Sequence, residues 1–413
     1  MSLQRGSCRR YHRILPGTLN RRIPLVLLTL VLAAAPRAVS MHRAAGAIAG
    51  SALPYLPGSI LPTGVTGFAA PYKDIVAGPG KNESTVIAAG PHGLSARTFA
   101  VAPAPDPAQP FVAVATYDDG VIIHDMYAPF RARAALGIGG APGDVAIDAR
   151  GRLASATTDG ETATIATLDP WGVTRYANVP FCDELAFDSR TGALFVTNRD
   201  VNGFGALTRI DADGGISHRV LGLTAEGLAI DAARGRVYVA NVNDGSVSVV
   251  DAKSMVELRR FHVVDRVFSL ALSRDGSRLY AVSNQSVQSP FAAAGSVVAV
   301  DTTDGRIVAR SARLAFPIGI AVDAARERLY VTDEDTNAVD VLDARTLRSV
   351  RTPLQTCDTP WNPTLDRGLL WVPCARSDQI DVFDTATLQR IAGAPFATGG
   401  YPLAVAIWHG SNS

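Results

Sequence analysis

The chain has 413 residues, and its 39 Lys and Arg residues nearly balance its 38 Asp and Glu residues, for a formal net charge of +1. No dense Lys/Arg cluster is interleaved with aromatic residues. Together these features exclude nucleic-acid binding driven by the overall electrostatic field. No long apolar run follows the first forty residues, so we expect no membrane span beyond them.

Residues 1–40 have the order of a secretory signal peptide. They contain seven Arg and no acidic residue, then an apolar run from Leu25 to Ala35, then the small residues Ala38-Val39-Ser40. The run is too short to cross a bilayer as a helix, although a signal anchor is an alternative interpretation. The segment Asn20-Arg21-Arg22-Ile23 leaves a twin-arginine signal open.

Removal of this leader would change the character of the protein. The net charge falls from +1 to −6 when the seven arginines are lost. Residues 41–64 are rich in Ala, Gly, Pro and Ser and are predicted to form a flexible linker. Residues 65–410 are predicted to form one folded domain. The expected location is the periplasm or the exterior, with no nucleic-acid partner and a monomeric state.

One pattern recurs along the domain about every 40 to 50 residues. The string GLAID at 227–231 with RVYVAN at 236–241 returns as GIAVD at 319–323 with RLYVTD at 328–333. A third alternating stretch follows each pair, at 246–251 and 338–343. Short apolar runs bounded by Gly, Asn and Asp are typical of strands. Four short strands in each repeat predict an all-β fold, a β-propeller of four-stranded blades.

The first strand of each repeat gives the expected number of blades. Its centres are Phe99, Val145, Leu185, Leu228, Leu270, Ile320 and Pro363. An eighth pattern, Pro402 to Ile407, has no second strand after it, and residues 65–90 hold apolar runs with no first strand. We therefore expect eight blades, with the ring closed by N- and C-terminal strands in one blade. Seven blades is the alternative if the terminal segments pack irregularly.

The second strands include Phe195-Val196-Thr197-Asn198, Tyr238-Val239-Ala240-Asn241 and Tyr330-Val331-Thr332-Asp333. This tetrapeptide resembles the YVTN family of β-propeller repeat proteins, which belongs with the lactonase-like and quinoprotein-dehydrogenase-like propellers. The resemblance covers about three-quarters of the chain and implies a blade scaffold in which the aromatic residue and Val pack between blades. It implies export for many members and supplies no catalytic residues. Trp371-Val372-Pro373-Cys374 lacks the Asn.

Three cysteines remain after the leader. Cys357 precedes the first strand of its blade and Cys374 ends the second, so the antiparallel pairing brings them to one end. A disulfide there suits an exported protein, and two free thiols are the alternative. Cys182 is then left over. It is interpreted as a small buried residue, or as a reactive thiol, although no adjacent His supports that role.

The start of each first strand should border one mouth of the central channel. Alignment of the repeats places acidic residues of three successive blades there, with a basic neighbour and an aromatic residue opposite: Asp144, Asp183, Glu184, Glu226, Arg97 and Trp361. These six are the candidate ligand-binding residues. In one interpretation the carboxylates are solvated or paired with Arg97; in the other, converging carboxylates hold a bound cation. Asp144, Asp183 and Glu226 are then the metal ligands, and a divalent cation such as calcium is the candidate cofactor.

The chain contains none of the common local catalytic motifs. There is no Cys-x-x-Cys-His, Gly-x-Ser-x-Gly, phosphate loop or His-Glu-x-x-His. The loop from Ser283 to Gly295 is the longest of its kind, and insertions in repeat proteins often lie on the binding face. We therefore expect a binding or scaffold module for a small ligand or a protein partner. The alternative is a lactonase-like metal-dependent hydrolase or a periplasmic dehydrogenase subunit.

Overall fold

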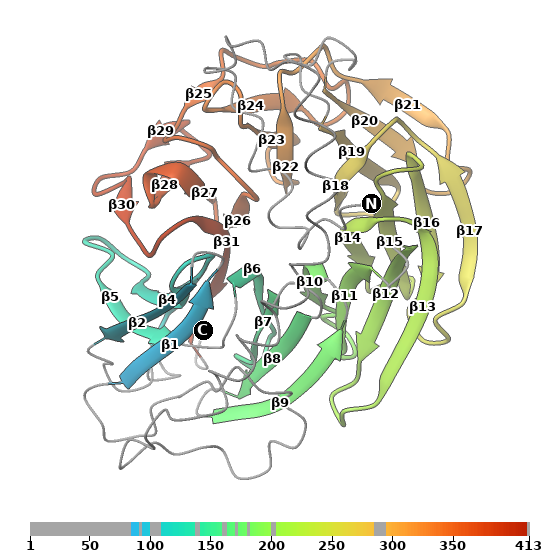
Figure 1. The fold of residues 1–413 in the computed structure, drawn as a ribbon. Coiled ribbons are helices and arrows are strands. Elements are labelled where there is room, and N and C mark those ends of the chain that lie inside the picture. The colour runs from blue at the N-terminus through green and yellow to red at the C-terminus, as the bar shows by residue number, and fades with distance from the viewer. Residues whose placement is uncertain are drawn as a thin grey trace, which may run out of the picture.

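The computed structural model in Figure 1 describes residues 84–90, 93–99, 109–136, 141–158, 163–169, 172–179, 182–199, 204–284 and 295–410. Side chains are described for 109–135, 141–156, 182–198, 204–284 and 295–410. The predicted leader at 1–40, the predicted linker at 41–64 and residues 65–83 of the predicted domain lie outside the described residues. No described helix has the length and hydrophobicity needed to cross a lipid bilayer.

Five of the described sheets each contain four consecutive antiparallel strands, ordered in space as in the sequence. The first two consist of β6 (Ala141–Ile147), β7 (Leu153–Thr158), β8 (Ala163–Asp169) and β9 (Gly172–Val179), and of β10 (Cys182–Phe187), β11 (Leu194–Arg199), β12 (Phe204–Ile210) and β13 (Ile216–Leu223). The next two consist of β14 (Ala225–Asp231), β15 (Arg236–Asn241), β16 (Ser246–Asp251) and β17 (Glu257–His262), and of β18 (Val267–Leu272), β19 (Arg278–Ser283), β20 (Ser296–Asp301) and β21 (Ile307–Arg310).

Two further sheets continue this order. One consists of β22 (Pro317–Asp323), β23 (Arg328–Asp333), β24 (Ala338–Asp343) and β25 (Leu354–Gln355). The other has five strands, with β30 paired to β28 beside the path β26 to β29: β26 (Thr364–Asp366), β27 (Leu369–Cys374), β28 (Gln379–Asp384), β29 (Gln389–Arg390) and β30 (Phe396–Ala397). A short 3-10 helix, η3 (Ala375–Ser377), connects β27 to β28.

A seventh sheet joins the two ends of the described chain. Strand β31 (Pro402–Trp408) pairs with β3 (Phe111–Thr116), which continues into β4 (Gly120–Asp125) and β5 (Ala132–Leu136). Strand β31 also contacts β6 on one side and β26 and β27 on the other. In Figure 1 the sheets follow one another around a central axis, from β6 through β14 and β22 to β31. The described residues therefore form an all-β propeller.

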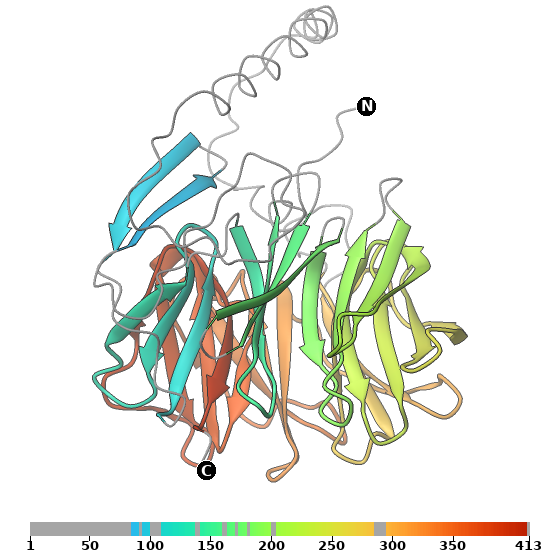
Figure 2. The same ribbon diagram turned by 90° about the horizontal axis from the view of Figure 1, so that it is seen from below.

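The N-terminal strands differ from the prediction. Strands β1 (Ser84–Gly90) and β2 (Gly93–Phe99) pair only with each other, as a two-stranded sheet. Figure 2 shows this hairpin beside the disc of larger sheets. The pattern centred on Phe99 is thus not the first strand of a four-stranded sheet, because β31 occupies that position beside β3. Seven sheets of four or five strands, not eight, lie in the described part of the chain.

The aromatic residue of the second strand explains how neighbouring sheets pack. Tyr238 and Tyr330 have no exposed surface and belong to clusters that include apolar residues of the following sheet. Phe195 packs in the same way against the sheet of β14 to β17. Burial of large side chains between every two sheets is the main stabilising term of this arrangement. The predicted role of these residues between blades is confirmed.

Candidate functional site

The loops that precede the first strands lie at one end of the sheets, together with the loops between second and third strands. We call this end the leading face; the C-terminal end of β31 lies at the opposite face in Figure 2. Six of the seven first strands begin with a register shift against the second strand, for example between Cys182 and Leu185 and between Pro317 and Ile320. Such a bulge re-aims the side chains of the extra residues. Asp183, Glu184 and Glu226 lie in these bulges.

Threonine of the second strand supports the bulge from behind. Thr197 Oγ1 accepts the backbone N–H of Glu184 at 3.0 Å, and Thr332 Oγ1 accepts that of Gly319 at the same distance. The next residue holds the loop that leads into the first strand. Asp333 accepts the N–H of Phe316 at 3.1 Å, and Asn241 accepts that of Gly222 at 3.1 Å. The tetrapeptide therefore positions the leading face as well as the core.

Two of the predicted acidic residues tie neighbouring sheets together. Asp144 Oδ2 accepts the N–H of Leu185 in the next sheet at 2.9 Å, and Glu184 Oε2 accepts that of Leu228 at 2.8 Å. Burial raises the pKa of Asp144 to about 7. Burial also raises the pKa of Glu184 to about 8, and the charges of Asp144 and Asp183 act in the same direction. These two carboxyl groups thus accept hydrogen bonds from the backbone of the next sheet. The sequence analysis had considered solvation, pairing with Arg97 or a bound cation, but not this role.

The same position holds glycine in two other sheets. A Cβ atom on Gly227 would lie 2.4 Å from the carbonyl oxygen of Phe268, and one on Gly319 would lie 2.5 Å from Pro363 Cδ. First strands therefore approach each other closely at this level. Where the residue is Asp or Glu, its carboxylate spans to the next strand; where it is Gly, the strands themselves come together.

In the described part of the chain, the predicted metal ligands are not gathered into one group, and the cation stays a prediction. Among the side chains that the structure describes, no group of three or more His, Cys, Asp or Glu residues could hold a metal ion, and this includes Asp144, Asp183 and Glu226. Both oxygens of Asp144 instead accept backbone N–H groups, from Val145 at 2.8 Å and from Leu185. Glu226 is buried, with 6% of its surface exposed.

Arg97 lies in the N-terminal hairpin rather than in one of the large sheets, and Trp361 lies at the leading face in apolar surroundings. Arg97 lies in β2, opposite Val86 of β1, and its side chain is outside the described residues. Trp361 lies at the leading face but packs in an apolar cluster contributed by several sheets. Its buried members are Val242, Phe268, Ile318, Trp361, Ala375 and Leu403, with Tyr117, Phe316 and Tyr401 partly exposed against them. Four of these occupy the aligned position that in the preceding sheets holds Asp183 and Glu226.

The apolar cluster reaches across the leading face. The ring centroids of Phe268 and Trp361 are 6.4 Å apart in an edge-to-face arrangement, although their strands are separated by the sheet of β22 to β25. Tyr117 and Tyr401 make a similar contact at 6.3 Å. The leading face thus has one acidic side and one aromatic side. The aligned first-strand residues show the same division, acidic at Asp183 and Glu226 and apolar at Phe268, Ile318, Trp361 and Leu403.

Two polar residues interrupt the apolar side, and the sequence analysis did not single them out. The residue after the second strand is Val242, Ala375 or Tyr117 in three sheets, and all three belong to the apolar cluster. In the sheets of β18 to β21 and β22 to β25 it is Asn284 and Glu334. Asn284 is 1% exposed, and neither polar atom of its side chain has a hydrogen-bond partner. The same holds for Oε2 of Glu334.

Glu334 lies in a locally acidic part of the leading face. Burial raises the pKa of its carboxyl to about 7; the charge of Arg376 opposes this shift, and those of Asp335, Asp358 and Asp333 add to it. Its backbone N–H donates to the carbonyl of Phe316 at 3.0 Å. Asn362, which follows Trp361, also has a buried Oδ1 without a hydrogen-bond partner. Buried polar atoms without partners are rare in folded proteins and often mark a functional site.

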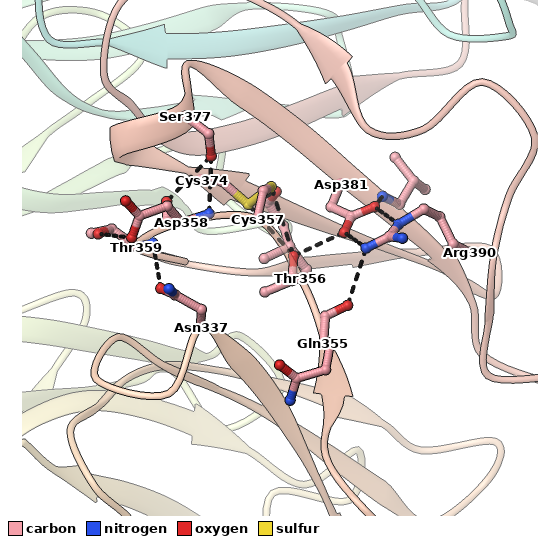
Figure 3. Close-up of a disulfide and its surroundings, with 12 residues drawn as sticks. Asn337, Gln355, Thr356, Cys357, Asp358, Thr359, Cys374, Ser377, Asp381 and Arg390 are labelled. Atoms are coloured by element: carbon pink, nitrogen blue, oxygen red, sulfur yellow. Dashed lines mark hydrogen bonds and ion pairs between the residues drawn. A yellow bond between two sulfur atoms is a disulfide. The ribbon is translucent and has the colours of Figure 1, made fainter.

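A disulfide fixes the loop that carries Trp361. Cys357 and Cys374 are joined, with their Cα atoms 5.6 Å apart, the pairing that the sequence had left open. Figure 3 shows the bridge beside Asp358, whose N–H donates to Ser377 Oγ at 3.0 Å. Thr359 N donates to Asn337 Oδ1 of the neighbouring sheet at 2.9 Å. Cys182 is buried between sheets and is not part of a disulfide.

The chain has relatives of limited coverage. No family model matches it. It is 30% identical over 149 residues to YncE, an uncharacterized protein of Salmonella typhi, a match that covers 34% of this chain and 38% of that protein. The chain therefore matches less than two-fifths of the length of this curated relative.

Solved structures share the fold more completely. A protein from Lactobacillus plantarum matches with a TM-score of 0.59 and 16% identity, over 72% of this chain and 99% of that one. A protein from Bacteroides uniformis, provisionally named a 6-phosphogluconolactonase, matches with a TM-score of 0.59 and 13% identity, over 73% and 99%. Identities this low show the fold alone: the chain is a β-propeller.

Proposed function

We propose that the protein is an exported binding module that holds a small ligand at the leading face, beside Asn284 and Glu334. The observation that carries this proposal is the set of buried polar atoms without partners at the same face as an apolar, aromatic cluster. Leaving a buried polar group unsatisfied costs about 1–3 kcal/mol. A ligand that supplied the missing hydrogen bonds would recover this cost, which gives these residues a reason to be polar.

The scaffold of this module is a seven-bladed ring of the YVTN type, closed by β31 and β3. The pairing of β31 with β3 and its contacts with β6, β26 and β27 support closure. The second-strand threonine supports the bulge in two sheets, at Thr197 and Thr332, which favours the repeat assignment. A rigid ring suits binding because it holds side chains from several blades in place without rearrangement.

Export rests on the leader at 1–40 and agrees with the disulfide, since such bonds persist in oxidising compartments. The alternative of a lactonase-like hydrolase draws on the name given to the Bacteroides uniformis protein. No arrangement of the described side chains favours it over binding, so binding is the function we propose. Intact mass of the secreted protein tests export: loss of about forty residues and of two hydrogens for one disulfide is expected.

A thermal-shift screen of small molecules tests the binding function directly. Compounds that bind should stabilise the wild-type protein, by about 2.7 kcal/mol at a hundredfold excess over Kd. The same compounds should not stabilise the Asn284→Leu variant, in which an apolar side chain of similar size replaces the amide. If every stabilising compound acts equally on both proteins, the proposed site is wrong.

A further inference from the structure

The balance of hydrogen-bond acceptors and donors among the unpartnered polar atoms at the leading face favours some classes of ligand over others. Three oxygens lack hydrogen-bond partners there: Asn284 Oδ1, Glu334 Oε2 and Asn362 Oδ1. They come from three successive sheets, those that begin with β18, β22 and β26. The donor Asn284 Nδ2 lacks a partner beside them as well, so among the side chains of Asn284, Glu334 and Asn362 the atoms without partners are three acceptors and one donor group. The set is rich in acceptors, so its complement is a group rich in N–H or O–H donors.

Charge favours a cation. Three acidic residues act on Glu334, namely Asp333, Asp335 and Asp358, against the single Arg376. A ligand that carried a negative charge would meet repulsion at this position, whereas a cation would be attracted. An ammonium group combines a positive charge with three N–H donors.

The neighbouring side chains favour an organic cation over a metal ion. Phe268 and Trp361 are in edge-to-face contact, and Ile318 and Phe316 belong to the same cluster. Aromatic rings attract ammonium groups and cover apolar carbon. A hard metal ion such as Ca²⁺ needs six to eight oxygen ligands and gains nothing from apolar neighbours.

We propose that the ligand is an organic ammonium ion with an apolar or aromatic body, its charged group held by Glu334 and Asn284. This inference rests on the proposed binding function and narrows it to a chemical class. The ammonium donates to the carboxylate of Glu334 and to the amide oxygen of Asn284. The apolar body lies against the cluster that contains Phe268 and Trp361.

Calorimetry with 2-phenylethylamine tests the proposal at pH 8. Two matched probes differ only in the end group: 2-phenylethanol, which is neutral, and 3-phenylpropanoate, which is an anion. We expect saturable binding of the amine, and weaker binding of both other probes by about tenfold or more, the size of a charge-assisted hydrogen bond. Glu334→Gln and Asn284→Leu should each weaken amine binding by a similar factor.

The matched control variant is Glu327→Gln. Glu327 lies in the turn between β22 and β23, in the same sheet as Glu334 but at the opposite face. Amine binding unchanged by Glu327→Gln and weakened by Glu334→Gln supports the proposal. Equal binding of amine and alcohol, no saturable binding of the amine, or binding of CaCl₂ alone at this site overturns it. Compounds that stabilise the wild-type protein but not Asn284→Leu would still support a binding site of another class, so the two proposals fail separately.

Discussion

The carboxyl group of Glu184 shows how one residue can serve the ring rather than a ligand. Its Oε2 accepts the N–H of Leu228 in the next sheet, and burial raises its pKa to about 8. The folded state therefore holds a proton that the unfolded chain, with an ordinary pKa of about 4.3, would release. Stability from this group is fully present below about pH 4 and is lost as the pH rises through about 8.

Glu184→Gln is expected to remove this dependence. The amide keeps an oxygen to accept the Leu228 N–H and cannot ionise. Unfolding in urea should show a wild-type protein that loses on the order of a few kcal/mol between pH 5 and pH 9, and a variant with a flatter profile that is the more stable of the two at pH 9. Identical pH profiles for the two proteins would show that Glu184 is already ionised in the folded state.

Two second-strand tyrosines offer a sharper comparison. The hydroxyl of Tyr280 donates to the carbonyl of Ala344 at 2.9 Å, whereas the buried hydroxyl of Tyr238 has no hydrogen-bond partner. Tyr280→Phe should therefore destabilise the protein by about 1 kcal/mol, and Tyr238→Phe should be neutral or stabilising. Equilibrium unfolding of both variants measures the difference. A larger loss for Tyr238→Phe would mean that its hydroxyl is satisfied in solution.

Turn residues were predictable from sequence because their chemistry is local. Asp231 and Asp323 accept backbone N–H groups within three residues, as Asx turns do. Asn284 was not predictable in the same way. Its importance comes from Val242, Ala375 and Tyr117 at equivalent positions, and from the apolar cluster around them. A comparison of the residue after each second strand does not single it out, because Asp159, Asp200 and Glu334 are also polar at this position; the burial of its amide is known only from the structure.

At the scale of elements, the disulfide stabilises the loop between β25 and β26. It closes a segment with a sequence separation of 17 residues, which corresponds to about 3 kcal/mol of stabilisation in the chain-entropy model. Cys357→Ser with Cys374→Ser should lower stability by this order. Because the loop carries Trp361 to the leading face, the double variant should also weaken amine binding.

Reduction of the wild-type protein with dithiothreitol provides the independent check on the disulfide. It should reproduce the loss of stability without any substitution, and reoxidation should restore it. Stability unaffected by both the reduction and the double variant would contradict the stabilising role.

The strands of the ends were harder to predict than the repeats between them. The pattern at Phe99 has the composition of a first strand, yet it pairs with β1, and β3 takes its innermost partner from the other end of the chain. Apolar alternation reports that a strand has a buried face but not which strand lies beside it. Strands β3 and β31 are separated by about 290 residues, and their pairing depends on how all the sheets pack together. No local sequence pattern contains that information.

At the scale of the whole molecule, β31 joins the two ends of the described chain. Ala404 and Ala406 belong to a cluster with Val145 of the next sheet, and Val405 to a cluster with Trp371 of the previous one. Truncation after Gly399 removes β31 and leaves β3 as a free edge. The truncated protein should lose cooperative unfolding and self-associate, as seen by calorimetry and light scattering, whereas truncation after Gly410 should behave as the full chain.

The propeller architecture followed from the repeats, because each blade needs the same aromatic residue, bulge and turns. The candidate site did not, because it depends on where three blades differ from that pattern: Asn284, Glu334 and Asn362. The acidic residues Asp144 and Glu184 at the first strands were candidates for ligand binding because of their charge. Their carboxyl groups instead accept the N–H groups of Leu185 and Leu228 and connect neighbouring sheets. The proposed binding site therefore depends on departures from the repeat that leave buried groups without partners.

Hydrogen–deuterium exchange with and without 2-phenylethylamine tests the central claim, that ligands bind at the leading face between the sheets of β18 and β26. Slower exchange is predicted in residues 262–268, 312–318, 333–338 and 357–362, which form that part of the face. Residues 232–235, 274–277 and 324–327, the turns at the opposite face, should be unchanged. Protection confined to these turns, or protection at neither face, would contradict the account.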